Sequence, residues 1–230
     1  MIKFSSDGFT IIELMIAITI LSVLLLMSSV VLTGVGNLFY KGVNMSNVQD
    51  VNRNIIADVT SSIQFSGSVL NNGAGISSPV VGNYNGNVID AYCFGTTRYS
   101  FVAGSQAFNN WPHVLWKDSM QSNSTCYPLD IQQPTPTCGA VAQSVCSPSQ
   151  SGGTELAGNN MHLASFQITY YNNQLYGISV GLASGYRDMF VSNANGPVVN
   201  NGSFTCNSGS GQQYCATSFL STLATERLGQ

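Results

Sequence analysis

Charge is scarce in this sequence. Only 7% of its 230 residues are charged, with 7 Lys+Arg against 10 Asp+Glu and a formal net charge of −3. Beyond Lys3 the basic residues are scattered, which argues against nucleic acid as a main ligand. Asn, Ser, Gly and Thr carry the polar surface instead. This composition is typical of an exported domain with an uncharged exterior rather than of a cytosolic enzyme.

Catalytic motifs are absent as well. The sequence has no G-x-S-x-G, no H-E-x-x-H and no phosphate-binding glycine loop, and it has only two histidines. Carboxylates are too few and too dispersed for a calcium loop. We therefore expect no enzyme, no cofactor and no metal. His113, within Trp111–Trp116, is expected in a partly buried aromatic cluster, or alternatively in an exposed patch that binds sugars or surfaces. Arg187 and Asp188 are expected to form a turn with a local ion pair.

Cysteine is missing from the first 92 residues and occurs six times after them. An even number in a Gly-, Ser- and Asn-rich exported domain predicts disulfides. A metal site is the alternative, but no two cysteines have C-x-x-C spacing and neither histidine lies near a cysteine pair. Six cysteines allow 15 pairings. Bridges between sequence neighbours would be Cys206–Cys215, Cys138–Cys146 and Cys93–Cys126, of which the first closes a polar loop. Cys126 could equally close on Cys138 or Cys146.

The residues from Gly8 to Leu32 form one apolar stretch with a single charge, Glu13, and the first proline of the chain is Pro79. As a helix, the 24 residues from Phe9 to Leu32 rise ~36 Å, enough to cross a hydrocarbon core of ~30 Å. A carboxylate inside such a span is costly and indicates a function. No Lys, Arg or His lies between Phe9 and Lys41, so the segment holds no cationic partner for Glu13. A freed α-amino group at Phe9 would supply one.

These residues resemble the type IV prepilin motif, which is shared by pilins and type II secretion pseudopilins. The match consists of a short polar leader ending at Gly8, then Phe-Thr-Ile-Ile-Glu-Leu and an apolar run. The resemblance implies that a prepilin peptidase cuts between Gly8 and Phe9 and N-methylates Phe9. It also implies that Glu13 pairs with the amino terminus of a neighbouring subunit during assembly. The leader lacks the apolar core of a secretory signal peptide.

The pattern becomes amphipathic between Asn37 and Phe65. One apolar stripe recurs at steps of three and four residues, namely Val48, Val51, Ile55, Val59 and Ile63. The other faces are expected to be polar: Gln49, Asp50, Asn52, Arg53, Asn54, Asp58 and Ser61. One helix is therefore expected from Phe9 to Ser66, with a bend or local melting plausible at Gly34 and Gly36. Gly67 and Asn71–Gly75 should end it.

Short β-type runs follow Gly75. Strands are expected at Val88–Phe94, Arg98–Val102, Val114–Trp116 and Thr217–Leu228, with a loop-like insertion at Gln121–Gly153. Two alternating runs between Ser165 and Leu182 predict a hairpin. A three-residue turn at 172–174 pairs Tyr170 with Tyr176 and Ile168 with Ile178, which puts both apolar sets on one face. The helix stripe is expected to dock on that face.

The sequence thus predicts an α+β fold, a long N-terminal helix packed on an antiparallel β-sheet with disulfide-stabilised loops. The expected parts are a leader at residues 1–8, an apolar transmembrane and assembly helix at 9–36, its amphipathic continuation at 37–66 and a β-rich extracytoplasmic domain at 67–230. The layout resembles minor pilins of the PilW/PulJ type. This implies other pilin subunits, an inner-membrane assembly platform and, before assembly, membrane lipid as partners. A pilus-displayed adhesin and a type II secretion pseudopilin are the alternatives.

Overall fold

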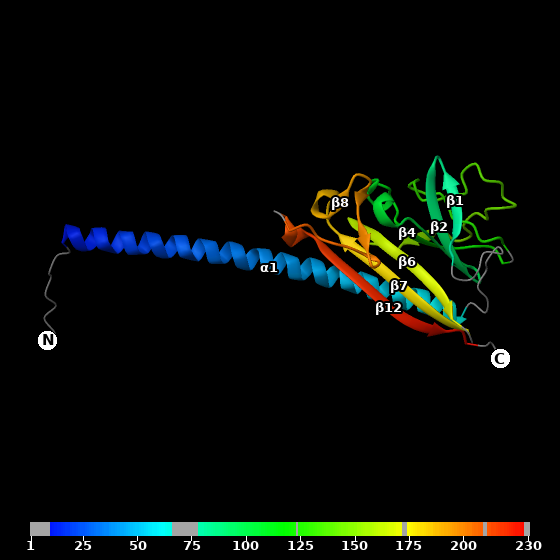
Figure 1. Cartoon of the computed structure of the whole chain (residues 1–230), viewed down its shortest axis with the longest axis horizontal. Helices are drawn as coiled ribbons and strands as arrows, with labels where there is room; N and C mark the ends of the chain where they lie inside the picture. The colour runs from blue at the N-terminus through cyan, green and yellow to red at the C-terminus, as the bar shows by residue number, and fades with distance from the viewer. Residues whose placement is uncertain (1–9, 66–77, 123, 172–173, 209–210, 228–230) are drawn as a thin grey trace.

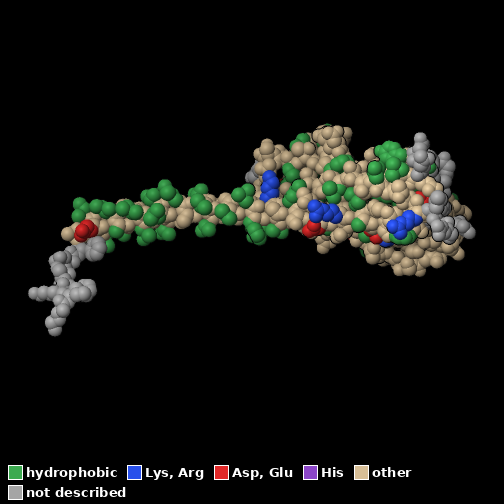
Figure 2. Space-filling model, turned by 90° about the horizontal axis from the view of Figure 1, so that it is seen from below, with side chains coloured by type: hydrophobic (Ala, Val, Ile, Leu, Met, Phe, Trp, Pro, Cys, Tyr) green, Lys and Arg blue, Asp and Glu red, His purple; other side chains and the backbone are tan. Residues whose placement is uncertain are grey.

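The computed structural model describes residues 10–65, 78–122, 124–171, 174–208 and 211–227, and it confirms the α+β fold. One helix, α1 (Ile11–Phe65), extends far beyond a β-rich domain and packs on it only with its second half (Figure 1). Gly34 and Gly36 do not interrupt the helix. The front of α1 has exposed apolar side chains on every side of the helix, and Figure 2 shows those that face the viewer.

The second half of α1 buries a stripe that differs from the expected one at a single step. Val48, Ile55, Val59 and Ile63 are buried as expected, whereas Val51 is only half-buried and Asn52 is fully buried. The assignment of Asn52 to a polar face was therefore wrong. Its amide Nδ2 donates to Val180 O at 3.1 Å, to Ser218 O at 3.3 Å and to Ser218 Oγ at 3.1 Å. These bonds offset the desolvation of the amide nitrogen, which explains how an asparagine is accommodated against the sheet.

The helix packs on a three-stranded antiparallel sheet with the order β12 (Ala216–Thr225), β7 (Leu175–Ser184) and β6 (Met161–Tyr171). Tyr170 pairs with Tyr176 and Ile168 with Ile178, which confirms the expected register, although turn residues 172 and 173 lie outside the described residues. The face toward α1 carries the apolar set, and it shares one core with the helix stripe. Small residues of β12 on this face, Ala216 and Ala224, allow the helix to approach closely.

A second, five-stranded antiparallel sheet follows the order β1 (Val80–Tyr84), β2 (Asn87–Phe94), β3 (Thr97–Phe101), β4 (Leu115–Ser119) and β5 (Gly153–Glu155). The predicted strands correspond to β2, β3 and β12, whereas β4 lies further along the chain than Val114–Trp116. One face of this sheet joins the helix core through Tyr92, Tyr99 and Phe101. The opposite face is covered by residues 121–152, whose described part forms no strand beyond the isolated bridge Asp130–Thr137. The loop-like insertion is thereby confirmed.

Aromatic rings join the two sheets. Phe166 of β6 lies edge-on to Phe101 at 5.0 Å and to Tyr92 at 5.4 Å between ring centroids. The Tyr92 hydroxyl also accepts a hydrogen bond of 3.3 Å from Ile168 N, at the edge of β6 that has no neighbouring strand. The rings and this bond fix the angle between the sheets.

Short elements cover the outer face of the three-stranded sheet, on the side away from α1 (Figure 1). They comprise η1 (Gly104–Phe108), η2 (Arg187–Met189), β8 (Ser192–Asn193), β9 (Gly196–Pro197), β10 (Val199–Asn200) and β11 (Ser203–Phe204), whereas η3 (Gln212–Tyr214) lies against α1. Their apolar side chains form a separate small core around Phe108, Phe190 and Phe204. A Cβ at Gly181 of β7 would collide with the Gly202 carbonyl, so glycine is needed there for the β10–β11 turn to lie against the sheet.

Candidate functional site

The first candidate site is the start of α1. Glu13 Oε2 accepts hydrogen bonds from Thr10 N at 3.0 Å and from Thr10 Oγ1 at 2.9 Å, and the Thr10 hydroxyl oxygen lies 3.4 Å from the Glu13 amide. This is a capping box, in which a Thr before the helix and a Glu three residues later satisfy each other's backbone donors. The T-x-x-E spacing of Thr10 and Glu13 encodes this polar partner, which was not among the sequence predictions, where only a cationic partner for Glu13 was considered. Gly8 and Phe9 lie outside the described residues.

The apolar front of α1 is the second feature of this site. By length and composition the helix could cross a membrane. Exposed apolar residues occur on all sides of the helix from Ile11 to Val43, and the Ile11 residue is 81% exposed. Several of its polar side chains bond to the helix itself; Ser22 Oγ donates to Ile18 O at 2.7 Å and Ser28 Oγ to Leu25 O at 2.9 Å. A surface of this size is uncovered only in an isolated chain, since large exposed apolar patches mark contact with lipid or protein.

A polar link fixes α1 to the five-stranded sheet. Asp58 on the helix accepts from the Tyr99 hydroxyl at 2.7 Å and forms an ion pair of 2.7 Å with Lys117 Nζ. Ser62 Oγ lies 2.7 Å from the same Tyr99 hydroxyl. The rotation of the helix about its axis is therefore set by directional bonds as well as by the apolar stripe.

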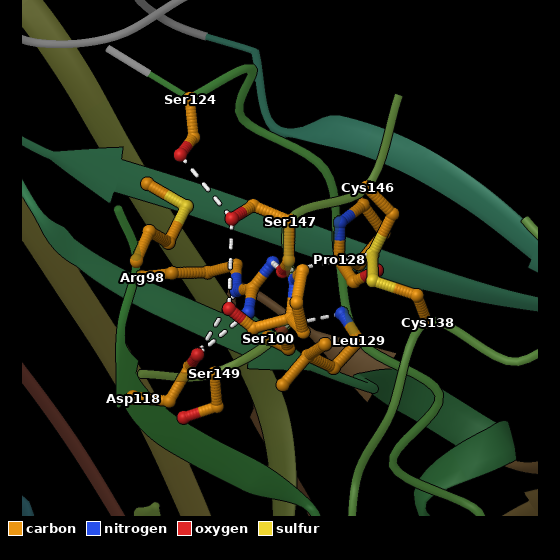
Figure 3. Close-up of polar contacts among 12 residues, drawn as sticks. Arg98, Ser100, Asp118, Ser124, Pro128, Leu129, Cys138, Cys146, Ser147 and Ser149 are labelled. Carbon is orange, nitrogen blue, oxygen red and sulfur yellow. Dashed lines mark hydrogen bonds and ion pairs between the residues drawn. A yellow bond between two sulfur atoms is a disulfide. The ribbon is translucent and has the colours of Figure 1, made fainter. Parts of the chain in front are cut away.

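A fully buried ion pair holds the insertion on the domain. Arg98 of β3 and Asp118 of β4 are cross-strand partners, and both side chains are 0% exposed. Arg98 Nε and Nη2 donate to the two Asp118 carboxylate oxygens at 2.9 and 2.6 Å. Its remaining nitrogen, Nη1, donates to Tyr127 O and Ser147 O, both at 2.9 Å. Figure 3 shows the Arg98 side chain between Asp118 and Ser147.

Two further contacts complete this anchor. Ser100, two residues after Arg98, accepts from Leu129 N at 2.9 Å. Ser124 donates to Ser147 Oγ at 3.2 Å, which joins two distant points of the insertion (Figure 3). The insertion thus adopts one conformation because buried polar groups of the sheet bind its backbone.

Three disulfides join Cys93 to Cys126, Cys138 to Cys146 and Cys206 to Cys215 in the structure. These are the pairs expected if each cysteine bonds to its neighbour in the sequence. The first attaches the insertion to β2, and the second closes the insertion on itself beside Pro128. The third closes the loop that carries η3. This loop contacts α1, since the Tyr214 and Tyr40 ring centroids are 6.1 Å apart and Asn44 Nδ2 donates to Gln213 O at 3.4 Å.

The residues around His113 form a partly buried cluster. The His113 ring lies 4.3 Å from that of Trp116, its Nε2 lies 3.1 Å from Pro134 O and its Nδ1 lies 3.3 Å from Glu155 Oε2. Glu155 also accepts from Val114 N, Leu115 N and Ala157 N at 3.0–3.1 Å. Burial raises the pKa of the Glu155 carboxyl despite these donors. These contacts hold the cluster together, since the Glu155 carboxylate accepts hydrogen bonds from three backbone amides.

The local ion pair expected between Arg187 and Asp188 does not occur among the described ion pairs. The two residues are neighbours in the 3₁₀-helix η2, where successive side chains point about 120° apart. The Arg187 guanidinium lies against Gly196 instead. Across the described residues, no three His, Cys, Asp or Glu side chains are grouped so that they could hold a metal ion.

The fold and these contacts define a class: a β-rich, disulfide-linked domain carried on a long helix whose free half is apolar. Residues 3–29 match the family described as the prokaryotic N-terminal methylation motif. That motif indicates a type IV pilin-like protein, and it coincides with the start of α1 and its capping box. Comparison with curated proteins and with solved structures gave no match.

Proposed function

We propose that this chain is a minor type IV pilin or pseudopilin subunit of the PilW/PulJ type. A prepilin peptidase removes residues 1–8, methylates the new amino terminus at Phe9 and releases a subunit whose helix enters a pilus-like filament. The observation that carries the proposal is the methylation motif at residues 3–29, which extends into the exposed apolar front of α1. Such a helix needs lipid before assembly and neighbouring helices after it.

Glu13 is proposed to guide assembly. Within a lipid or helix bundle its carboxylate is costly unless a cation pairs with it. No Lys, Arg or His lies between Phe9 and Lys41, so the α-amino group of Phe9 on a neighbouring subunit is the natural partner. The capping box with Thr10 holds the carboxylate at the helix start, close in sequence to the cleavage point. This position supports pairing of Glu13 of one subunit with the Phe9 amino group of a neighbouring subunit, at the same height in the helix bundle.

The proposed division of the chain follows from this role. Residues 1–8 are the leader, 9–36 the membrane and assembly helix, 37–66 its packed continuation and 67–230 the extracytoplasmic domain. Three disulfides support an oxidising location for that domain, because such bonds persist outside the cytosol. The subunit would reach the filament through an inner-membrane assembly platform and contact other pilins along α1.

Processing is tested by intact-mass measurement of the protein from cells that contain an active prepilin peptidase. We expect the loss of Met1–Gly8 and one added methyl group at Phe9. A Gly8→Val variant, which changes the residue before the cut, should retain the leader. A wild-type chain recovered at full length would contradict the proposal.

The assembly role is tested with two substitutions of Glu13. Glu13→Val removes both the charge and the cap, whereas Glu13→Gln keeps an oxygen that accepts from Thr10 and removes only the charge. Both variants should insert into the membrane at least as well as the wild type, because the charge no longer has to be desolvated. Both should be depleted from sheared filaments, as measured by immunoblot of filament and membrane fractions.

The matched control is Ser28→Val, a polar-to-apolar change in the same apolar stretch, whose hydroxyl bonds only to its own helix. This variant should be incorporated normally. Normal incorporation of Glu13→Gln together with loss of Glu13→Val would assign the capping role alone to Glu13 and remove the charge pairing from the proposal.

A further inference from the structure

Two adjoining hollows form one groove on the outer side of the domain. One, of about 700 Å³, is lined by residues that include Phe108, Tyr186 and Arg187, and the other, of about 390 Å³, by residues that include Trp111 and Glu155. Both are lined by Asn110, Asn160 and His162, so they meet there. Volumes in this range are those of small-molecule sites. The elements that form the groove, η1 and the segment leading to β8, lie away from α1 (Figure 1).

The centre of the groove is held rigidly. The His162 ring stacks on Phe108 with centroids 3.9 Å apart and planes 24° from parallel. Its two ring nitrogens lie 2.8 Å from Ala107 O and 3.1 Å from Gly185 O. Because both nitrogens face backbone carbonyls, His162 connects η1 to the turn after β7 and has no nitrogen left for a ligand. The centre therefore offers flat ring surface rather than a catalytic base.

The polar groups around this centre are unengaged. Asn110 and Asn160 both have left-handed backbones, with φ of 53° and 59°, and their side chains make no hydrogen bond to any residue that the structure describes. Arg187 and Asp188 supply one charge of each sign without pairing with each other. Aromatic rings flank these groups on the two sides: Trp111 in one hollow, and Tyr186, which is 67% exposed, in the other.

This combination selects a ligand class. Amide groups donate and accept as hydroxyl groups require, and exposed aromatic rings stack on the C–H faces of pyranose rings. A phosphorylated ligand would need several cations, and Arg187 is the only Lys or Arg among the described residues that line either hollow. A purely apolar ligand would leave the asparagine amides and the two charged side chains without partners. We propose that the groove binds a neutral saccharide of two or three rings, with Trp111 and Tyr186 as the stacking surfaces.

Such binding would give the subunit a recognition role that does not depend on the proposed assembly function. The described residues that line the groove all lie between 107 and 192, outside α1, so a subunit engaged only through its helix would still present it. A purified chain can also be tested for binding without any filament, so failure of assembly and failure of binding are separate outcomes.

The experiment uses the full chain in an amine-oxide detergent, since sugar-headed detergents would compete. Lactose, maltotriose, cellotriose and chitotriose are titrated and followed by saturation-transfer NMR. We expect at least one to bind with a Kd below about 10 mM, and Trp111→Ala and Tyr186→Ala each to weaken it about tenfold. Trp116→Phe and Tyr214→Ala are the matched aromatic controls, because neither residue lines the groove, and they should bind as the wild type does.

Three results would overturn the inference. The first is that none of the four sugars binds at concentrations up to about 10 mM. The second is that one sugar binds, but the Trp111 and Tyr186 variants, shown to be folded by their denaturation curves, bind it as well as the wild type does. The third is that sialyllactose binds more tightly than lactose, which would assign an acidic ligand. Loss of binding in Trp116→Phe with retention in Trp111→Ala would move the site to the hollow between Trp116, Pro134 and Pro136.

Discussion

Removing the Arg98 side chain should destabilise the domain more than any change at an exposed charge. Arg98→Ala leaves the Asp118 carboxylate buried without a cation and deprives Tyr127 O and Ser147 O of their donor. Breaking a buried pair in this way costs about 3–5 kcal/mol. Domains of this size have only about 5–15 kcal/mol of stability, so the loss would be a large fraction of the total.

The measurement is denaturant unfolding of the full chain in detergent micelles, followed by Trp111 and Trp116 fluorescence. Trp116 lies on the sheet face that the insertion covers, so the signal reports on the affected region. Arg53→Ala is the matched control: Arg53 is 68% exposed and pairs with Asp50 at 3.8 Å on the helix surface. Its loss should change the free energy of unfolding by less than about 1 kcal/mol.

A paired replacement tests the cause. Arg98→Met combined with Asp118→Leu removes both charges and keeps most of the volume, so it should be more stable than Arg98→Ala alone. The two insertion carbonyls would still lack donors, so recovery should be partial. If Arg98→Ala costs no more than Arg53→Ala, or if the paired replacement is no better than the single one, an uncompensated buried charge is not what the Arg98 side chain prevents.

Two other predictions concern buried polar groups. Asn52→Asp places a carboxylate against the carbonyls of Val180 and Ser218, and it should lower the free energy of unfolding near pH 7 by about 3 kcal/mol or more, as measured with denaturant. The same change at the exposed Asn54 should be nearly neutral. Equal effects of the two changes would contradict the burial argument. Burial lowers the pKa of His162, so as pH falls below about 6.5 the unfolded chain takes up this proton first and stability is lost. Unfolding curves from pH 7.5 to 5 should therefore fall more steeply for the wild type than for His162→Gln, and parallel curves would refute this assignment.

Local pattern was enough to predict the elements that carry most of the fold. The apolar run and the stripe from Val48 to Ile63 predicted α1, since periodicity reports directly which face is buried. The alternation around Ile168 and Ile178 predicted the hairpin register, because a shift of one residue would have put the apolar sets on opposite faces.

Contacts between distant segments could not be predicted in this way. Arg98 reads as an ordinary strand residue, and only the pairing of β3 with β4 brings Asp118 opposite it. Asn52 is polar by composition, yet its neighbours on the sheet are more than a hundred residues away. The groove likewise combines loops at residues 107–111, 155–162 and 185–192, for which no local periodicity exists. The signal that was available, scarcity of charge, marks each charged residue within a strand as a candidate for burial.

The loop closed by Cys206 and Cys215 gives α1 a fixed point of exit from the domain. Its contacts with Tyr40 and Asn44 lie where the covered half of the helix ends and the free half begins. A pull along the axis of α1 would reach the domain there first, and the load would run along the backbone from Tyr214 through Cys215 into β12, at a point that the disulfide ties to Cys206. The helix would then be held in shear along its packed length instead of being peeled away from one end.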